Sequence, residues 1–385
     1  MNKVNIDMKA MKSNLKALHK HNPDAEIGLV VKSNAYAHDI TSMMPNLVKL
    51  TDYFFVGSST EAIDIASDFI LEQKEKLIFP LYTFVQEDLQ YLDVFQNIIL
   101  NICDMTSLDL AIAFVKQSNE RLNMSVEENK IHMQITPKKY RFNLNLDSGM
   151  HFLGFQSYQI PEVVEKLMAV KEIIGIYAVN THFATADDLT SEYYKEQFTD
   201  YAQMISLLIK AGIKFEAISY HNSASFIRND YQINIEGIKN IARIGISAYG
   251  YYPSKEIEDH YPELLLNPVL EWRSEIISIK KIRKGSFIGY GNNYKAEKNL
   301  TIAIVPIGYY EGLPRTTSNN NIVKINDKMY YTIGNVRMNM IAVDISDTDI
   351  ETGTEVILID KTWNASKIAQ QANTIPYEIL TNIKM

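Results

Sequence analysis

The chain has 385 residues, 46% of them hydrophobic, and a formal net charge of −8 at pH 7. An acidic chain without a long basic stretch does not have the charge of a nucleic-acid-binding protein, and no apolar run approaches the ~18 residues that span a membrane. The one cysteine, Cys103, excludes an internal disulfide and a cysteine-based zinc site, and we predict no metal site. The first residues lack an apolar signal segment, so we expect a cytoplasmic protein that contacts neither nucleic acid nor membrane.

Short β-type runs alternate with longer helical patterns between residues 27 and 247. The predicted strands are 27–31, 53–57, 77–82, 97–102, 141–147, 173–183, 215–220 and 241–247. The predicted helices include 61–73, 107–115 and 192–210; in the last, Tyr194, Tyr201, Ile205 and Leu208 recur on one apolar face. The alternation favours a parallel sheet, and about eight such strands fit a closed (β/α)8 barrel.

Two later segments break this rhythm. The polar segment 119–139 contains Pro137 and predicts an irregular excursion between the fourth and fifth strands. After Gly250 the helical periodicity fades, and further short strands are predicted at 275–280, 300–306, 322–325, 328–333, 341–345 and 355–359. We therefore expect a barrel over residues 8–248 and a smaller, mostly β domain over 249–385, to which residues 1–7 return with a strand at 4–6.

Lys32 stands at the end of the first of these strands, directly after an apolar run that ends at Val31. The carboxyl end of a barrel strand is where such barrels carry their chemistry, and desolvation there favours a neutral, nucleophilic amine. Tyr36, four residues later, offers a hydroxyl to an anionic group beside that amine. On this pattern alone, an ordinary lysine at a strand end remains the alternative interpretation, and other motifs must decide.

Several motifs occur in a definite order along the chain. They are VKSNAY at 31–36, DSGM at 147–150 with LGF at 153–155, THFATAD at 181–187, HNSA at 221–224, ARIGI at 242–246 with YG at 249–250, GYG at 289–291, IGY at 307–309 with Gly312 and PR at 314–315, and GNVRM at 334–338. With these motifs the sequence resembles the alanine racemases, pyridoxal-phosphate enzymes with a barrel followed by a β domain. Agreement across so many positions favours the functional interpretation of Lys32.

The resemblance implies two proton carriers. Lys32 would bind pyridoxal 5′-phosphate covalently and act on one side of the substrate Cα, and Tyr290 would act on the other. In this family the tyrosine comes from a second subunit, so the resemblance implies a homodimer with shared active sites. It places Met338, together with Tyr290, at an amino-acid substrate.

The resemblance also implies a cofactor site. Its predicted residues, besides Lys32, are Tyr36, His182, Asn222, Ser223, Arg243, Gly245, Ile246 and Tyr377. The phosphate would be bound by the hydroxyls of Tyr36, Ser223 and Tyr377 and by the N–H groups of Gly245 and Ile246. Arg243 would donate to the pyridine nitrogen, because a guanidinium has donors but no acceptor. His182 would pack beside the cofactor ring in a network with Arg243.

The chain departs from the family pattern at a few positions. Phe152 stands where an arginine is expected, Asn145 where a lysine is common, and Asn339 where an aspartate usually follows the methionine. With fewer cations near Tyr290, its phenol has less help in ionising, so we predict lower activity or a changed substrate preference, with an alkaline optimum. Arg337 is a candidate for the replacement charge. The chain also ends at Met385 without the Arg-rich final strand of typical members, for which we expect a looser edge of the β domain or an altered dimer contact.

The leading hypothesis is an alanine racemase that supplies D-alanine for peptidoglycan. A racemase for serine or another amino acid remains open, because the pocket charges are altered. A decarboxylase of the same barrel class is less well supported, since its glycine-rich phosphate loop and catalytic cysteine are not evident. A pyridoxal-phosphate-binding protein with little turnover is the alternative from a different class.

Overall fold

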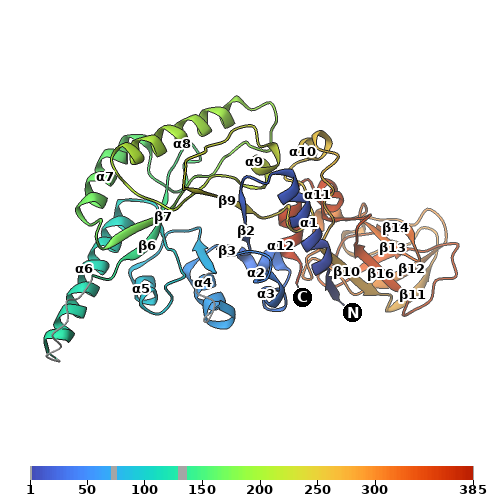
Figure 1. Ribbon diagram of the computed structural model, residues 1–385. Helices are drawn as coiled ribbons and strands as arrows, with labels where there is room; N and C mark the ends of the chain where they lie inside the picture. The colour runs from blue at the N-terminus through green and yellow to red at the C-terminus, as the bar shows by residue number, and fades with distance from the viewer. Residues whose placement is uncertain (1, 71–75, 129–136, 385) are drawn as a thin grey trace.

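The computed structural model describes residues 2–70, 76–128 and 137–384. Within these residues the chain forms two eight-stranded sheets, one parallel and one antiparallel, which lie side by side in Figure 1. The predicted fold class, a (β/α)8 barrel followed by a mostly β region, is confirmed. Both ends of the chain lie at the junction of the two sheets (Figure 1). Among the described residues, no helix is both long enough and apolar enough to cross a membrane.

The parallel sheet has the strand order β4-β3-β2-β9-β8-β7-β6-β5. A parallel bridge between Ile78 and Ile98, with an Ile99 N–H to Ile78 O distance of 2.9 Å, closes the sheet into a barrel. The barrel strands are β2 Glu26–Val30, β3 Tyr53–Val56, β4 Leu77–Pro80, β5 Asn101–Ile102, β6 Tyr140–Asn145, β7 Ile174–Asn180, β8 Ala217–Ser219 and β9 Lys239–Ile244. All eight predicted strands are present, most of them shorter than the hydrophobic runs that indicated them.

Helical segments connect and flank the barrel strands, and most of them cover the outside of the barrel. They are α1 Met8–His21, α2 Lys32–Ala37, α3 Ile40–Leu47, α4 Ser59–Ile65, α5 Gln86–Leu89, α6 Met105–Glu128, α7 Ile160–Ala169, α8 Glu192–Lys210, α9 Ser223–Arg228 and α10 Lys255–His260. In α8 the predicted apolar face is buried, with Tyr194, Tyr201 and Leu208 all inaccessible. A helical pattern predicts the outer layer well wherever one face packs on the barrel.

Two predictions about the segments outside the barrel strands need correction. The segment 119–139 is not irregular at its start, because α6 continues to Glu128 and extends beyond the barrel (Figure 1). Its polar composition hid the helix, since no apolar stripe marks a helix that has left the core. The predicted helix 61–73 is α4 followed by a π-helical turn, Ala66–Ile70. Residues 71–73 and 129–136 lie outside the described residues, and residues 137–139 belong to no helix or strand.

The antiparallel sheet, called here the C-terminal sheet, has the order β1-β10-β16-β13-β14-β15-β12-β11. Its strands are β1 Lys3–Ile6, β10 Leu270–Glu275, β11 Ser278–Ile282, β12 Leu300–Val305, β13 Ile322–Ile325, β14 Lys328–Ile333, β15 Ile341–Asp344 and β16 Glu355–Ile359. The predicted strand 4–6 is confirmed as part of β1, which pairs with β10. The single strand predicted at 275–280 was wrong: the Ile276 N–H donates to Thr354 and the Ile277 N–H to Ile304, so the chain changes partners there.

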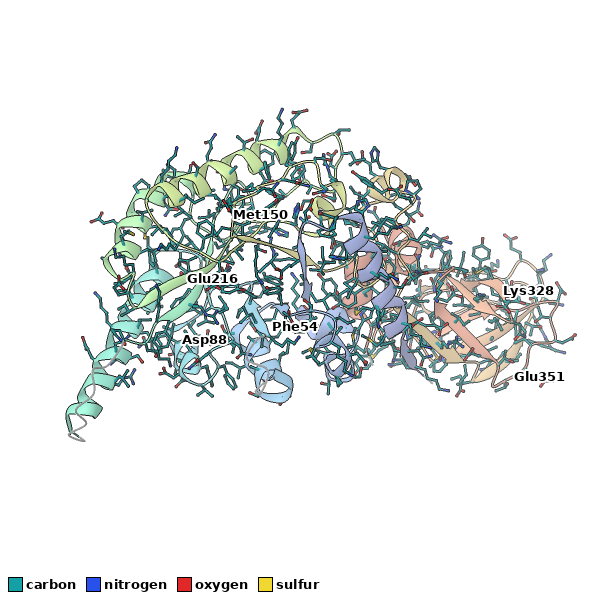
Figure 2. The ribbon with its side chains drawn as sticks, in the orientation of Figure 1. Phe54, Asp88, Met150, Glu216, Lys328 and Glu351 are labelled. Carbon is teal, nitrogen blue, oxygen red and sulfur yellow. The ribbon has the colours of Figure 1, made fainter. Side chains whose placement is uncertain are left out.

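One hydrophobic core runs from the barrel into the C-terminal sheet. Phe54 of β3 and Trp272 of β10 are fully buried, and Cys103 is buried as well. Figure 2 shows that Lys328 and Glu351 mark the far end of the C-terminal sheet. After β16, helices α11 Ala365–Ala372 and α12 Pro376–Asn382 return to the barrel, where α12 packs against α2. This return brings the last helix next to Lys32.

Candidate active site

Lys32 follows β2 and begins α2, which is a left-handed turn. Residues Ser33 to Ala37 all have φ between 53° and 58°. Left-handed backbone costs ~1–2 kcal/mol per non-glycine residue, so the turn needs support from outside. Glu61 supplies part of it, because its carboxylate accepts the N–H groups of Ser33 at 2.8 Å and of Gly57 at 2.7 Å. The turn aims Lys32 and Tyr36 to the same side of the barrel.

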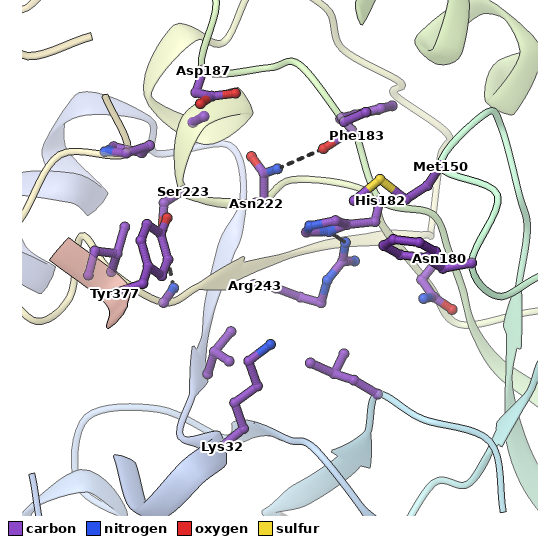
Figure 3. A pocket seen from close by; sticks show the side chains of 18 of the residues that line it. Lys32, Met150, Asn180, His182, Phe183, Asp187, Asn222, Ser223, Arg243 and Tyr377 are labelled. Atoms are coloured by element: carbon purple, nitrogen blue, oxygen red, sulfur yellow. Dashed lines mark hydrogen bonds between the residues drawn. The ribbon is translucent and has the colours of Figure 1, made fainter. Parts of the chain in front are cut away.

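The amine of Lys32 points into a cavity of about 750 Å³ at the carboxyl ends of the barrel strands (Figure 3). Partial burial lowers the pKa of Lys32; the carboxylate of Glu61 opposes this effect and the cation of Arg243 adds to it. A lowered pKa increases the fraction of free amine, the form that attacks a carbonyl. The cavity therefore holds the kind of lysine that the strand pattern predicted.

Hydroxyl and backbone donors converge on one end of this cavity. Ser223 accepts the N–H of Gly245 at 3.2 Å, and a Cβ at position 245 would overlap the hydroxyl of Tyr36. The Tyr36 and Tyr377 rings lie 6.1 Å apart, and burial raises the pKa of both phenols, so both remain protonated donors. Ile246 lines the same end. Neutral hydroxyls gathered in one concave place can donate hydrogen bonds to a phosphate.

Arg243 of β9 reaches the middle of the cavity (Figure 3). Its Nη1 donates to the carbonyl and, at 2.9 Å, to the Oγ of Ser219, and its Nη2 donates to the Thr181 carbonyl at 2.5 Å. Burial lowers the pKa of Arg243 to about 10, which leaves it a cation at neutral pH. The cation is thus held rigidly in the cavity by acceptors from β8 and the end of β7.

His182 lies beside Arg243, with its Nδ1 3.3 Å from Nη2 of the guanidinium. The His182 side chain lines the cavity and is exposed there. Desolvation and then the neighbouring cations of Arg243 and Lys32 lower the pKa of His182, so the ring is neutral at pH 7. The predicted Arg243–His182 network is present.

Asn222 contributes mainly to local structure. Its Oδ1 accepts the Ser225 N–H at 2.9 Å and caps α9, and its Nδ2 donates to the Phe183 carbonyl at 3.4 Å (Figure 3). The cap places Ser223 at the start of α9, where its hydroxyl meets Gly245.

Two uncharged amides, Asn145 and Asn180, line the cavity, and Asn101 and Asn143 lie behind them in the same hydrogen-bond network. Asn143 donates to Asn101 at 2.7 Å and to Asn180 at 2.6 Å, and Asn180 donates to Asn145 at 2.9 Å. All four asparagines are buried. Phe152 stands at the mouth of the cavity and is 84% exposed. The positions where the resemblance led us to expect a lysine and an arginine therefore carry no charge.

Two predicted site residues lie away from the cavity. Tyr290 is 75% exposed and Met338 55% exposed, and neither lines the cavity. Tyr290 sits at the tip of a hairpin loop whose sides meet at a bridge between Phe287 and Lys295. Asn335 donates to the Tyr290 carbonyl at 2.8 Å, which ties the loop to the segment that carries Met338.

Sequence reasoning missed several residues around the cavity. Asn180 ends β7 and Tyr82 follows β4, and both line the cavity. Asp187 and Ile375 line it as well, and Glu61 supports the turn after Lys32. For Asn180 and Tyr82, the position after a barrel strand was the signal that could have found them.

The fold and this cavity define a class of protein: barrel enzymes that hold a phosphate-bearing aldehyde cofactor on a lysine. Comparison with known families makes the class specific. The alanine racemase N-terminal domain model matches residues 6–253, and the alanine racemase C-terminal domain model matches residues 269–385. The chain belongs to the alanine racemase family, whose members are pyridoxal-phosphate-dependent racemases.

Individual relatives agree with this assignment. The alanine racemase of Helicobacter pylori strain G27 is 29% identical, over 99% of this chain and 96% of the relative. That of Vesicomyosocius okutanii is also 29% identical, over 99% and 95%. The crystal structure of alanine racemase from Streptomyces lavendulae superimposes with a TM-score of 0.86 over 100% of this chain and 94% of its own, at 24% identity, which shows the fold. A Clostridium difficile 630 alanine racemase has 28% identity and a TM-score of 0.84, over 100% and 93%.

The side chains present fit pyridoxal phosphate. The cavity offers a desolvated amine, neutral hydroxyls and a fixed guanidinium. A side chain at Gly245 would close the space beside the Tyr36 hydroxyl, so the glycine keeps this end open for a phosphate. Each part of the cofactor therefore has a chemically matched partner.

Proposed function

We propose that this protein interconverts L- and D-alanine, with Lys32 on one side of the substrate Cα and Tyr290 of a second copy on the other. Racemisation requires an acid and a base on opposite faces, which exchange roles with the direction of reaction. An amine with a lowered pKa is suited to one role, and a phenol to the other. The product would supply D-alanine for peptidoglycan.

The cavity residues divide the work. Lys32 holds the cofactor and moves a proton at Cα. The hydroxyls of Tyr36, Ser223 and Tyr377 bind the phosphate together with the N–H groups of Gly245 and Ile246. Pyridoxal phosphate, when bound, supplies an electron-withdrawing ring that makes the Cα proton removable.

Arg243 favours racemisation over side reactions of the cofactor. Because a guanidinium donates and does not accept, Arg243 would donate to the ring nitrogen of a bound cofactor, which would then carry no proton. That arrangement limits electron withdrawal into the ring, which favours return of the proton to Cα over side reactions. Neutral His182 keeps Arg243 oriented through its Nδ1.

Exposure of Tyr290 supports a shared active site. A phenol 75% exposed and away from its own cavity has no role within one chain. In a two-fold dimer each copy would present Tyr290 and Met338 to the cavity of the other. This arrangement explains why the two site residues that miss the cavity lie on one surface.

The observation that carries the proposal is the Lys32 amine, whose pKa is lowered in a cavity that also holds Arg243. The test follows deuterium at Cα by NMR after the cofactor-loaded protein is given L-alanine in D₂O. We expect deuterated D-alanine to accumulate. Cα exchange without inversion would show that one proton carrier is missing.

A parallel sample with L-serine addresses the specificity left open by the uncharged wall at Asn145 and Phe152. Faster exchange with serine than with alanine would indicate that serine is the preferred substrate of the same reaction. Absence of exchange with any amino acid, while the cofactor stays bound, would favour a binding protein over a racemase.

A further inference from the structure

An amino-acid substrate brings a carboxylate that needs a cation. Among the described residues lining the cavity, the cations are Lys32 and Arg243. Lys32 is the amine that holds the cofactor, and Arg243 already donates to Ser219, Thr181 and His182. The wall around Asn145 and Asn180 offers amides only. The barrel by itself therefore has no uncommitted cation for the substrate's carboxylate.

Such a cation lies next to Tyr290. The guanidinium carbon of Arg337 is 5.8 Å from the centroid of the Tyr290 ring, within the range of a cation–π contact. The Arg337 side chain is half-buried, and its Nη1 contacts the sulfur of Met340 at 3.7 Å. Among the ion pairs of the described residues none includes Arg337, so its charge is available to a ligand.

The Arg337 backbone is fixed to the loop that carries Tyr290. The Arg337 carbonyl accepts the Tyr309 N–H at 2.9 Å, and its N–H donates to Met340 at 3.1 Å. A side chain at Gly308 would overlap the carbonyls of Arg337 and Met338, so the glycine permits this close approach. Asn335 closes the assembly through its bond to the Tyr290 carbonyl.

We propose that Arg337 binds the α-carboxylate of the amino-acid substrate and orients the ring of Tyr290. The assignment rests on the proposed function, because it takes Tyr290 as the second proton carrier. Since Arg337 and Tyr290 share one rigid surface of one chain, Arg337 enters whichever cavity Tyr290 enters. A guanidinium matches a carboxylate with two parallel N–H donors, so Arg337 supplies the charge that Phe152 does not.

The test measures binding of propionate, the carbon skeleton of alanine without its amino group, to the cofactor-loaded protein by calorimetry. We expect Arg337→Gln to weaken propionate binding by about 10- to 100-fold, as for loss of a charge-assisted hydrogen bond. The KM for alanine should rise by a similar factor, with a smaller change in kcat. Arg337→Lys keeps the charge but not the paired donors. Its propionate affinity should lie between those of the wild type and Arg337→Gln.

Arg283→Gln is the matched control, because Arg283 is an exposed arginine of the same sheet region outside the cavity. It should leave propionate affinity and KM unchanged. Equal propionate affinity in wild type and Arg337→Gln, with Cα exchange intact in the wild type, overturns the role of Arg337 and leaves Lys32 and Tyr290 in place. No Cα exchange in the wild type overturns the proposed function and this assignment together.

Discussion

In the barrel, Lys32 and Arg243 reach one cavity from two strands, whereas in the C-terminal sheet Tyr290 and Met338 stand on an open surface. The barrel residues gain their properties from burial, which lowers the pKa of Lys32 and of Arg243. The sheet residues gain theirs from a rigid loop that presents them outward. The comparison separates a cavity that one chain forms by itself from an exposed loop that, under the proposed function, acts at the cavity of a partner.

Lys32→Ala tests the barrel cavity, and it should have the largest effect on activity. Without the amine, turnover should fall at least ~10³-fold, and the visible absorbance of the bound cofactor, with its sensitivity to borohydride, should be lost. Lys49→Ala, which removes an exposed lysine from the neighbouring helical region, is the control and should behave as wild type. Normal turnover in Lys32→Ala would end the assignment of the cavity.

Tyr290→Phe should lower racemisation about 10²- to 10⁴-fold, the range for loss of a general acid or base, while cofactor absorbance persists. Mixing this variant with Lys32→Ala tests the shared site. Random mixed dimers pair one intact Lys32 with one intact Tyr290, so about a quarter of wild-type activity should return. If activity stays at the level of the separate variants, the tyrosine does not act across a dimer.

Acid should destabilise the fold through the buried histidines of the barrel. Burial lowers the pKa of His38 to about 4 and that of His221 to about 3, and no histidine occurs after His260. A depressed histidine pKa contributes stability that is present above the unfolded value near 6.5 and lost as pH falls toward the folded value. Between pH 7.5 and 5, each histidine should cost at most about 2 kcal/mol of unfolding free energy.

Urea unfolding at the two pH values checks this expectation. His38→Gln should remove part of the pH dependence, because its side chain does not titrate. A barrel transition that keeps the same urea midpoint at both pH values would show that neither ring governs stability.

Gly308→Ala tests the exposed loops of the C-terminal sheet. The added Cβ meets backbone carbonyls that cannot move aside, so we expect a loss of about 2 kcal/mol in thermal unfolding and a higher KM for alanine. Gly353→Ala is the control: Gly353 has φ 88° with open space around it, so strain of about 1 kcal/mol should appear without a change in KM. An unchanged KM in Gly308→Ala would show that this loop does not affect substrate binding.

Asn339→Asp should have the smallest effect. The Asn339 amide donates to Glu311 at 2.7 Å, and Glu311 also accepts the Gly308 N–H at 2.7 Å. An aspartate would place a second carboxylate there, at a cost of about 1 kcal/mol that weakens in ~1 M salt. Equal thermal stability of the variant and the wild type at low salt would show that the amide is not required.

The sequence alone predicted most of the fold, because period-2 and period-3.6 patterns arise wherever a strand or helix packs one side on a core. It also placed Lys32 correctly at a strand end. It missed the extension of α6 to Glu128, where a polar helix has no core to mark it. It likewise joined β10 and β11, because hydrophobicity does not record that Ile276 and Ile277 pair with different strands.

Residue types and their order thus determined the chemistry available to this protein: an amine, a guanidinium, hydroxyls and a phenol. Only the tertiary structure decided which of them meet. The pKa of Lys32 depends on burial and on Glu61 and Arg243, which come from distant parts of the chain. The pairing of Arg337 with Tyr290 likewise depends on two loops that the antiparallel sheet brings together, and no local pattern records such a contact.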